Sequence, residues 1–435
     1  MGDGTVAILD PFRQFRSLDR DVLVLSVAMF AFSLGFQMTS RYLPEYIAVL
    51  GGGAVVIGVF GSFGNVISAI YPYPGGVFSD RIGSRVALTL FGFVSSVGFA
   101  VWLFAPTIGT ISLGPVTLEP WLWIFSGLVL AQAWKSFGLG GTFAIVKQSV
   151  PPSQLAAGFA STEKFRRTAF LVGPVLAAGV LYVATDFTRG FRFVLAVAVV
   201  FGIAATLVQH SLYDASEDSI GSEFDGIAQI AEDFRDMPEE LRPLLIGDTL
   251  VRFANGMVYV FFVIVVVRFL EVDAMVLGFY LAPEVLFGVL LGIEMLVALL
   301  TMAPAARIAE FVGLKPVVAT GFFVYALFPI LLITAPANAA IVGLLFAFSG
   351  LRFAGLPAHK ALIVGPAEQG AGGRVSGSYY LVRNVIVIPS SALGGWIYSV
   401  DPRLAFGLAS GIGLVGTGYF LARGKEFGPY ASAPA

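Results

Sequence analysis

The residues of this sequence that could do chemistry are charged side chains placed inside long apolar stretches. Within residues 241–270, Asp248, Arg252 and Asn255 follow at intervals of four and three, so a helix carries them on one face. A charge in the core of a bilayer is costly unless it is paired or faces water. We therefore expect such faces to line a polar cavity or to hold a charged ligand.

Basic side chains exceed acidic ones at the mid-span positions, which favours an anionic ligand. Arginine binds a carboxylate or a phosphate through two parallel hydrogen bonds. The candidate substrate-binding residues are Gln37, Arg41, Lys135, Arg252, Asn255, Arg352 and Arg383. Gln37 and Arg41 are four residues apart, so we expect them to align on one face of their helix. His359 and Lys360 lie near the predicted cytosolic end of their span. Contact between their side chains and the lipid headgroups is enough to explain both residues.

Carboxylates inside the apolar stretches are candidates for proton binding, because the proton affinity of a carboxylate depends on its access to water. The candidates are Glu294, Glu284, Asp248 and Glu163. Asp248 and Glu163 each precede an arginine by four residues, so a structural ion pair explains these two equally well. For Glu284 and Glu294 the alternative is a salt bridge to a basic residue on another helix.

The composition requires that these residues be positioned by membrane-spanning helices. The chain has 435 residues, of which 57% are hydrophobic and 12% charged, whereas a soluble protein has about 25% charged residues. Its apolar stretches number about twelve, and each is long enough to cross a bilayer. The sequence therefore predicts an all-α polytopic membrane protein.

Several classes of function lack the residues they need. There is no cysteine, and the two histidines, His210 and His359, do not form a zinc-protease HExxH motif. No P-loop is present, and the net charge of −2 gives no field that would attract nucleic acid. We expect neither an enzyme nor a metal or other cofactor.

The distribution of Lys and Arg predicts that both termini are cytosolic in a cell membrane. The hydrophilic insert between spans six and seven is strongly acidic, and it divides the chain. We expect a first half at 1–210, an acidic cytosolic linker at 211–240 and a second half at 241–435. A solvated linker is the favoured interpretation of the insert, and a regulatory role is the alternative.

The second half repeats the first after a shift of about 230 residues. Pro74 falls on Pro304 and Gly83 falls on Gly313. A related echo with a different offset joins WKSFGLGG at 134–141 to LRFAGLPA at 351–358. Two pseudo-symmetric halves of six spans each follow from this repeat. Internal repeats of this kind are typical of secondary transporters.

The loop after span two resembles the signature loop of the major facilitator superfamily. The residues that carry the resemblance are Gly76, Asp80, Arg81, Gly83 and Arg85, with Glu310 and Lys315 in a weaker second copy. The resemblance covers essentially the whole chain and implies the superfamily fold, with this loop as a cytoplasmic gate that holds the two halves together. The alternative is that these charges only follow the positive-inside rule.

Span five contains Gly173, Pro174 and Gly179. This stretch resembles the fifth-helix motif of proton-coupled exporters in the same superfamily, and the resemblance implies a packing or hinge role and favours export. Generic close packing of membrane helices explains the same residues equally well.

These observations together predict a secondary active transporter that works by alternating access. We expect it to be proton-coupled, to act as a monomer in the lipid bilayer and to move a small organic solute that is anionic or amphipathic. The alternatives are a multidrug antiporter that exports lipophilic cations, and a non-transporting receptor on the same fold.

Overall fold

The computed structural model describes residues 20–71, 81–134, 155–212, 239–364 and 372–426. Contacts between Cα atoms divide the chain into two compact units. Unit 1 consists of Met1–Tyr46 and Ile70–Glu223, and unit 2 consists of Ile47–Ala69 and Phe224–Ala435. The division at 211–240 expected from the sequence remains a prediction.

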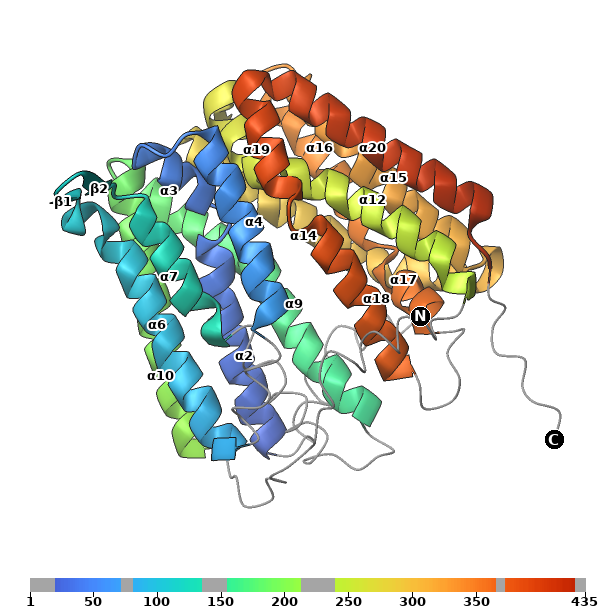
Figure 1. The fold of residues 1–435 in the computed structure, drawn as a ribbon, viewed down its shortest axis with the longest axis horizontal. Coiled ribbons are helices and arrows are strands. Elements are labelled where there is room, and N and C mark those ends of the chain that lie inside the picture. Colours follow the sequence, from blue (N-terminus) through green and yellow to red (C-terminus); the bar gives the residue numbers. More distant parts are fainter. Residues whose placement is uncertain (1–19, 72–80, 135–154, 213–238, 365–371, 427–435) are drawn as a thin grey trace. The chain divides into compact units, whose positions relative to one another are not determined.

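Unit 1 is a bundle of apolar helices, drawn from blue to green in Figure 1. Its helices are α2 (Arg20–Thr39), α6 (Ser84–Ile108), α7 (Leu122–Gln132), α9 (Leu155–Tyr182) and α10 (Phe187–Leu212). Strands β1 (Ile111–Leu113) and β2 (Val116–Leu118) form an antiparallel hairpin between α6 and α7. Helix α3 (Leu43–Val49) crosses the division between the units.

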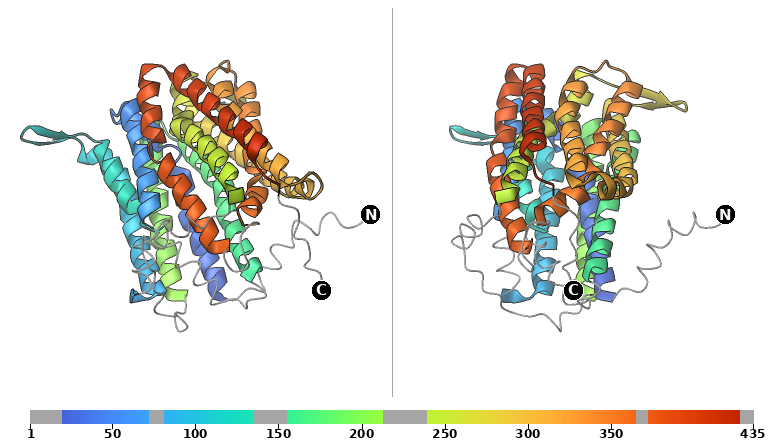
Figure 2. Two further views of the ribbon diagram at one scale, coloured as in Figure 1. Left: turned by 45° about the vertical axis from the view of Figure 1, so that its right-hand side comes forward. Right: turned by 90° about the vertical axis from the view of Figure 1, so that its right-hand side faces the viewer.

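Unit 2 contains α4 and the second part of the chain. Its helices are α4 (Ala54–Ile70), α12 (Arg242–Val258), α13 (Phe262–Ile264), α14 (Pro283–Val312), α15 (Leu314–Ile333), α16 (Ala339–Gly350), α17 (Leu356–Val364), α18 (Gly372–Val387), α19 (Ser390–Val400) and α20 (Pro402–Arg423). Short turns η3 (Glu239–Leu241), η4 (Tyr259–Phe261), η5 (Val265–Phe269) and η6 (Leu351–Phe353) join or extend them. The hairpin of β3 (Ala274–Val276) and β4 (Phe279–Leu281) extends away from the start of α14 (Figure 2).

The helical segments agree with the expected membrane architecture. When helices separated by a short break are taken together, the described chain has twelve successive segments: α2 with α3, α4, α6, α7, α9, α10, α12 to η5, α14, α15, α16 with α17, α18 with α19, and α20. Seven of the described helices are long and apolar enough to cross a membrane, and three more are apolar but shorter. The chain is thus a multi-pass membrane protein.

Two of the breaks inside spans have a local cause. The span that begins with α16 leaves the α-helix at Gly350 and resumes it at Leu356. Gly355 and Pro357 lie at this break, and Pro357 has no N–H to donate to the Phe353 carbonyl oxygen, as a helix that continued through the break would require. Pro389 separates α18 from α19 in the same way. Each break places side chains at mid-span that a continuous helix would point elsewhere.

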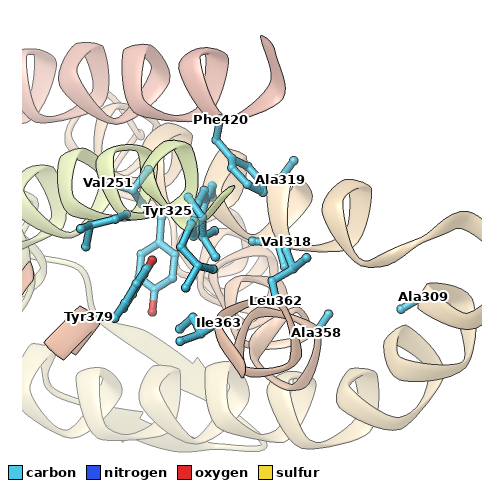
Figure 3. Packing of buried hydrophobic residues seen from close by; sticks show 14 residues of the cluster. Val251, Ala309, Val318, Ala319, Tyr325, Ala358, Leu362, Ile363, Tyr379 and Phe420 are labelled. Atoms are coloured by element: carbon cyan, nitrogen blue, oxygen red, sulfur yellow. The ribbon is translucent and has the colours of Figure 1, made fainter. Parts of the chain in front are cut away.

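The apolar core of unit 2 surrounds the ends of α12, α15, α17 and α20. Figure 3 shows its side chains, among them Val251, Phe420 and Tyr379. Tyr379 is fully buried, and its hydroxyl leaves this core to enter a polar contact that is described below. The apolar packing therefore fixes the position of a polar group at its edge.

Glycine permits close helix packing in unit 2. A Cβ at Gly58 of α4 would collide with the backbone of Ser391 and Gly395 on α19. The Ser62 hydroxyl oxygen accepts a hydrogen bond from the Ala392 N–H at 2.9 Å. Helix α4 thereby lies directly against α19 and takes part in the cavity described next.

Candidate functional site

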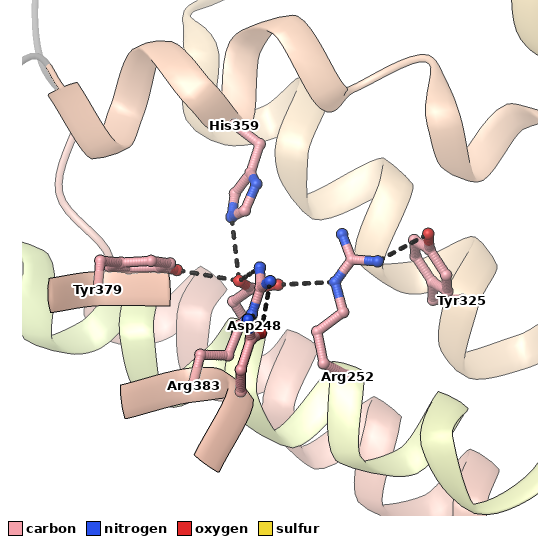
Figure 4. A network of polar contacts seen from close by, with 7 residues as sticks. Asp248, Arg252, Tyr325, His359, Tyr379 and Arg383 are labelled. Carbon is pink, nitrogen blue, oxygen red and sulfur yellow. Dashed lines mark hydrogen bonds and ion pairs between the residues drawn. The ribbon is translucent and has the colours of Figure 1, made fainter. Parts of the chain in front are cut away.

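Asp248 is the centre of a buried polar network in unit 2 (Figure 4). Its carboxylate is fully buried on α12 and accepts hydrogen bonds from Arg252 Nε at 3.2 Å, Arg383 Nη1 at 3.0 Å and the Tyr379 hydroxyl at 3.2 Å. Arg252 lies one turn further along α12, whereas Arg383 and Tyr379 come from α18, also one turn apart. The four-residue spacing that the sequence singled out therefore forms the predicted ion pair.

His359 is also part of this network. Its Nε2 lies 3.4 Å from Asp248 Oδ2, which is an ion-pair distance but lacks the geometry of a hydrogen bond. The side chain is 4% exposed, and its ring packs edge-on against Phe322 and Tyr379. The interpretation that His359 reaches the headgroups is therefore wrong, because α17 turns this residue into the protein interior. Lys360, the next residue, is exposed.

A second ion pair adjoins the first through Tyr325 of α15. Arg252 Nη1 donates to the Tyr325 hydroxyl at 2.9 Å. The guanidinium carbons of Arg252 and Arg352 lie 4.7 and 5.0 Å from the centre of the Tyr325 ring, which are cation–π distances. Arg352 Nη2 donates to Glu294 Oε1 at 2.7 Å, and the Ser349 hydroxyl donates to the same oxygen at 2.5 Å. Glu294 thus forms the inter-helix salt bridge that the sequence left as its alternative role.

These two ion pairs form what we call the buried polar cluster: Asp248, Arg252, Glu294, Tyr325, Arg352, His359, Tyr379 and Arg383. Three of its members are arginines and two are carboxylates. Apart from His359, the cluster carries one more positive than negative charge. An unbalanced charge with so little access to water is unfavourable, so the cluster favours an anionic partner.

A cavity of about 190 Å³ opens beside Asp248 and is polar on one side. Arg252, Asn255 and Tyr259 line it from α12 and its continuation, while Arg383 and Asn384 line it from α18. Gly61 and Asn65 of α4 complete the lining. The Asn255 Oδ1 is buried and has no hydrogen-bond partner among the described residues. The cavity therefore has charged and amide side chains on its lining, and at least one buried polar atom without a partner in the described chain.

Comparison with known proteins agrees with this architecture. An uncharacterised MFS-type transporter of Methanocaldococcus jannaschii is 23% identical over 395 residues, which cover 90% of this chain and 92% of that protein. An uncharacterised MFS-type transporter of Mycobacterium tuberculosis is 25% identical over 190 residues, or 43% of this chain and 41% of that protein. No protein-family model matches the chain.

Solved transporter structures have the same fold. The nucleoside transporter NupG superimposes with a TM-score of 0.72 at 12% identity, covering 93% of this chain and 98% of that one. A POT family transporter in complex with 5-aminolevulinic acid gives a TM-score of 0.71 at 16% identity, covering 94% and 99%. This chain is therefore similar to an MFS-type transporter over nearly its whole length, and it has the fold of these solved transporters.

Three of the candidate substrate-binding residues of this chain meet in the 190 Å³ cavity: Arg252, Asn255 and Arg383. Arg352 does not line this cavity and is almost completely buried in its pair with Glu294. In unit 1, Gln37 lies on α2 and Arg41 lies in the turn that follows it, so the break after Thr39 interrupts their common helical face. Lys135 lies outside the described residues.

The remaining proton-binding candidates lie far apart along the chain. Glu284 lies in the first turn of α14, next to the β3–β4 hairpin and half-buried. Glu163 belongs to α9, in a stretch whose side chains are not among those described. Among the candidates whose side chains are described, Asp248 and Glu294 are the two that are buried, and both are paired with arginine.

The candidate gate residues are described in part. Gly76 and Asp80 lie outside the described residues, while Arg81 is exposed. Gly83 precedes α6 with a φ of 83°, and its counterpart Gly313 precedes α15 with a φ of 93°. Both conformations favour glycine, so the two copies of the loop enter the next helix in the same way.

The contacts of the two loop copies differ. Arg85 Nε donates to the His210 carbonyl oxygen at 2.8 Å, within unit 1. Glu310 is exposed, and the backbone N–H groups of Leu314 and Lys315 donate to the Glu426 carboxylate at 2.7 and 2.8 Å, within unit 2. An acid at the N-terminus of α15 offsets the partial positive charge of the helix end.

Of the three candidate residues in span five, Gly173 is the one at which two helices come too close for a side chain. A Cβ on Gly173 would lie 2.8 Å from the Gln37 Cβ, so α9 and α2 touch there. Pro174 is buried inside α9, which continues through it. A Cβ on Gly179 would meet no atom within 4 Å, so no contact in the described chain explains that glycine.

Sequence reasoning missed His359, Tyr325 and Tyr379 as partners of the cluster. The only signal was their polarity within apolar stretches. The distances that matter link residues 73 to 135 positions apart, and helical periodicity holds no information on which distant helices are neighbours.

Proposed function

We propose that this transporter moves a small organic anion across the cell membrane by alternating access, and that transport is coupled to protons. The observation that supports the proposal is that Arg252 and Arg383 both line the 190 Å³ cavity and both pair with the fully buried Asp248, which does not line it. Two guanidinium groups there share one carboxylate. A carboxylate or phosphate in the cavity would supply the missing negative charge and accept hydrogen bonds from both arginines.

Coupling follows from competition for these arginines. While Asp248 is ionised, it occupies Arg252 Nε and Arg383 Nη1. Protonation of Asp248 weakens both contacts and leaves the guanidinium groups available to the substrate anion. The proton and the anion then bind together, which is the behaviour of a symporter. This mechanism favours cotransport over the export that the fifth-helix resemblance implies.

We further propose that both termini are cytosolic and that the two halves, 1–210 and 241–435, move against each other about the linker at 211–240. In this proposal Gly76, Asp80, Arg81, Gly83 and Arg85 form the cytoplasmic gate with Glu310 and Lys315. The support is the repeat itself, together with the matching positive φ of Gly83 and Gly313. We propose that the transporter acts as a monomer.

The decisive experiment measures proton flux into proteoliposomes with a pH-sensitive dye when substrates are added. One panel contains small carboxylates and organic phosphates, and the other contains lipophilic cations. We expect anion-driven flux with the wild type, and a loss of at least tenfold in Arg383→Gln. This variant keeps the Asp248–Arg252 pair, so Asp248 retains a counter-charge.

The matched control is Arg403→Gln, which removes an exposed arginine from the first turn of α20 by the same chemical change. It should leave anion-driven flux unchanged. Flux driven by the cation panel alone would replace the proposal with a multidrug antiporter. Binding of an anion without flux of either kind would indicate a receptor on the same fold.

A further inference from the structure

A second, much smaller cavity lies at the break between α16 and α17. Its volume of about 10 Å³ holds one water-sized or monatomic guest. Arg252, Arg352, Tyr325 and His359 line it, together with the glycines and apolar residues Val318, Gly321, Phe322, Gly355 and Leu356. Neither Asp248 nor Glu294 lines it. The walls thus present cationic and aromatic groups without a carboxylate.

Arg352 supplies hydrogen-bond donors at this cavity that nothing in the described chain accepts. The residue is 2% exposed, and its Nη2 pairs with Glu294. Its Nε and Nη1 are buried and have no hydrogen-bond partner among the described residues. Buried donors on a charged group are rarely left unmet, because the desolvation penalty is then uncompensated. A guest that accepts two hydrogen bonds would satisfy them.

The helix geometry at the break favours a negative guest. Helix α17 has nine residues, Leu356–Val364, and its first residue lies on the cavity wall. The N-terminus of a helix carries a partial positive charge and binds anions. Broken membrane helices use their half-helix N-termini in this way. The positive end of α17 and the Arg352 guanidinium group therefore both favour an anion in this cavity.

The size and the charge of the site together select the class of ligand. Arg252 and Arg352 line the cavity and no carboxylate of the described chain does, so the site favours a negatively charged guest. A carboxylate, phosphate or sulfate is too large for about 10 Å³. We propose that this cavity binds a single halide ion of the chloride class, held by Arg352 Nε and Nη1 at the N-terminus of α17.

This site is separate from the proposed substrate cavity, although Arg252 lines both. The proposal does not depend on the substrate or on proton coupling. It is tested by the thermal unfolding of the purified full-length protein in detergent, in sodium chloride or bromide and in sodium gluconate at equal ionic strength. Chloride and bromide should raise the midpoint temperature of unfolding by about 3 °C or more, and the increase should level off at high halide concentration. Gluconate should not raise it.

Two variants distinguish the cavity from other cationic sites. Val318→Leu adds one methylene to the cavity lining without a change in charge, and it should abolish the difference between chloride and gluconate. Arg403→Gln removes an exposed arginine elsewhere in unit 2 and should keep the full difference. An equal halide effect in all three proteins would overturn the proposal, because the halide would then act elsewhere.

Anomalous diffraction from wild-type crystals grown in bromide gives a measurement that does not depend on any variant. We expect an anomalous peak between Arg352 and the start of α17. Equal midpoints in chloride and gluconate, together with no bromide peak in the cavity, would contradict the proposal and indicate that a water molecule satisfies Arg352.

Discussion

At the scale of single residues, Asp248 is the group on which the first ion-pair network depends. It accepts hydrogen bonds from Arg252, Arg383 and Tyr379 and is fully buried. Asp248→Asn leaves two arginines without a counter-charge. Because the arginine side chains are 23% and 16% exposed, we expect a loss of roughly 2 to 4 kcal/mol in unfolding free energy, less than for a fully buried pair.

A double-mutant cycle with Arg383→Gln checks this expectation. The double variant Asp248→Asn/Arg383→Gln removes one charge of each sign, so it should be more stable than the sum of the single losses predicts. The difference should be about 1 kcal/mol or more, measured by denaturant unfolding in detergent micelles. Strictly additive losses would mean that Arg383 and Asp248 do not interact in solution.

The same residues show how far the sequence could predict the site. The four-residue spacing of Asp248 and Arg252 predicted their pairing, because both lie on one helix. The pairing of Glu294 with Arg352 was an open alternative, since it depends on how α14 packs against the span of α16 and α17. The burial of His359 could not be foreseen, because it depends on the direction that α17 takes after the break at Gly355.

At the scale of helices, glycine contacts decide how closely α19 approaches α12. A Cβ on Gly394 would collide with the Met257 carbonyl oxygen, which is backbone and cannot rotate away. Gly394→Ala should therefore lower the unfolding free energy by about 1 to 3 kcal/mol. We expect the thermal midpoint of the purified protein to fall by several degrees.

The matched control for Gly394 is Gly411 on α20. A Cβ there would meet no atom within 4 Å, and the residue is helical. Gly411→Ala should leave stability unchanged or raise it by up to about 1 kcal/mol, because alanine is the better helix former. A similar loss in both variants would show that backbone flexibility, and not the α12–α19 contact, explains the effect of Gly394→Ala.

The element boundaries were the least predictable part of the fold. Apolar length and composition predicted about twelve spans, and the described helices group into twelve segments. The breaks within spans were not predicted, although Pro357 and Pro389 lie beside two of them. The turn at 40–42, which separates α2 from α3, also interrupts the face on which Gln37 and Arg41 were expected to align. Breaks of this kind depend on packing with neighbouring helices.

At the scale of the whole molecule, the repeat is the feature that the sequence predicted best. The two loop glycines, Gly83 and Gly313, share the same unusual backbone conformation 230 residues apart. Their surroundings have diverged, since Arg85 contacts a carbonyl oxygen and Glu426 caps α15. Sequence can therefore detect the repeat, while the contacts that each copy makes must be found in the structure.

The orientation of the molecule gives the last prediction. Helix α14 has 30 residues and is about 45 Å long, whereas the hydrocarbon core of a bilayer is about 30 Å thick. Leu277 in the hairpin before α14 is 94% exposed, and Glu310 near its end is also exposed. The two positions should therefore lie on opposite sides of the membrane.

The absence of cysteine makes this directly measurable, because Leu277→Cys and Glu310→Cys each create the only thiol in the chain. Since Lys and Arg concentrate around the Glu310 end, a membrane-impermeant maleimide should label Leu277→Cys in intact cells. Glu310→Cys should react only after permeabilisation, and the cysteine-free wild type should give no signal. The reverse pattern would place both termini outside the cell, while labelling of both variants in intact cells would contradict a membrane-spanning α14.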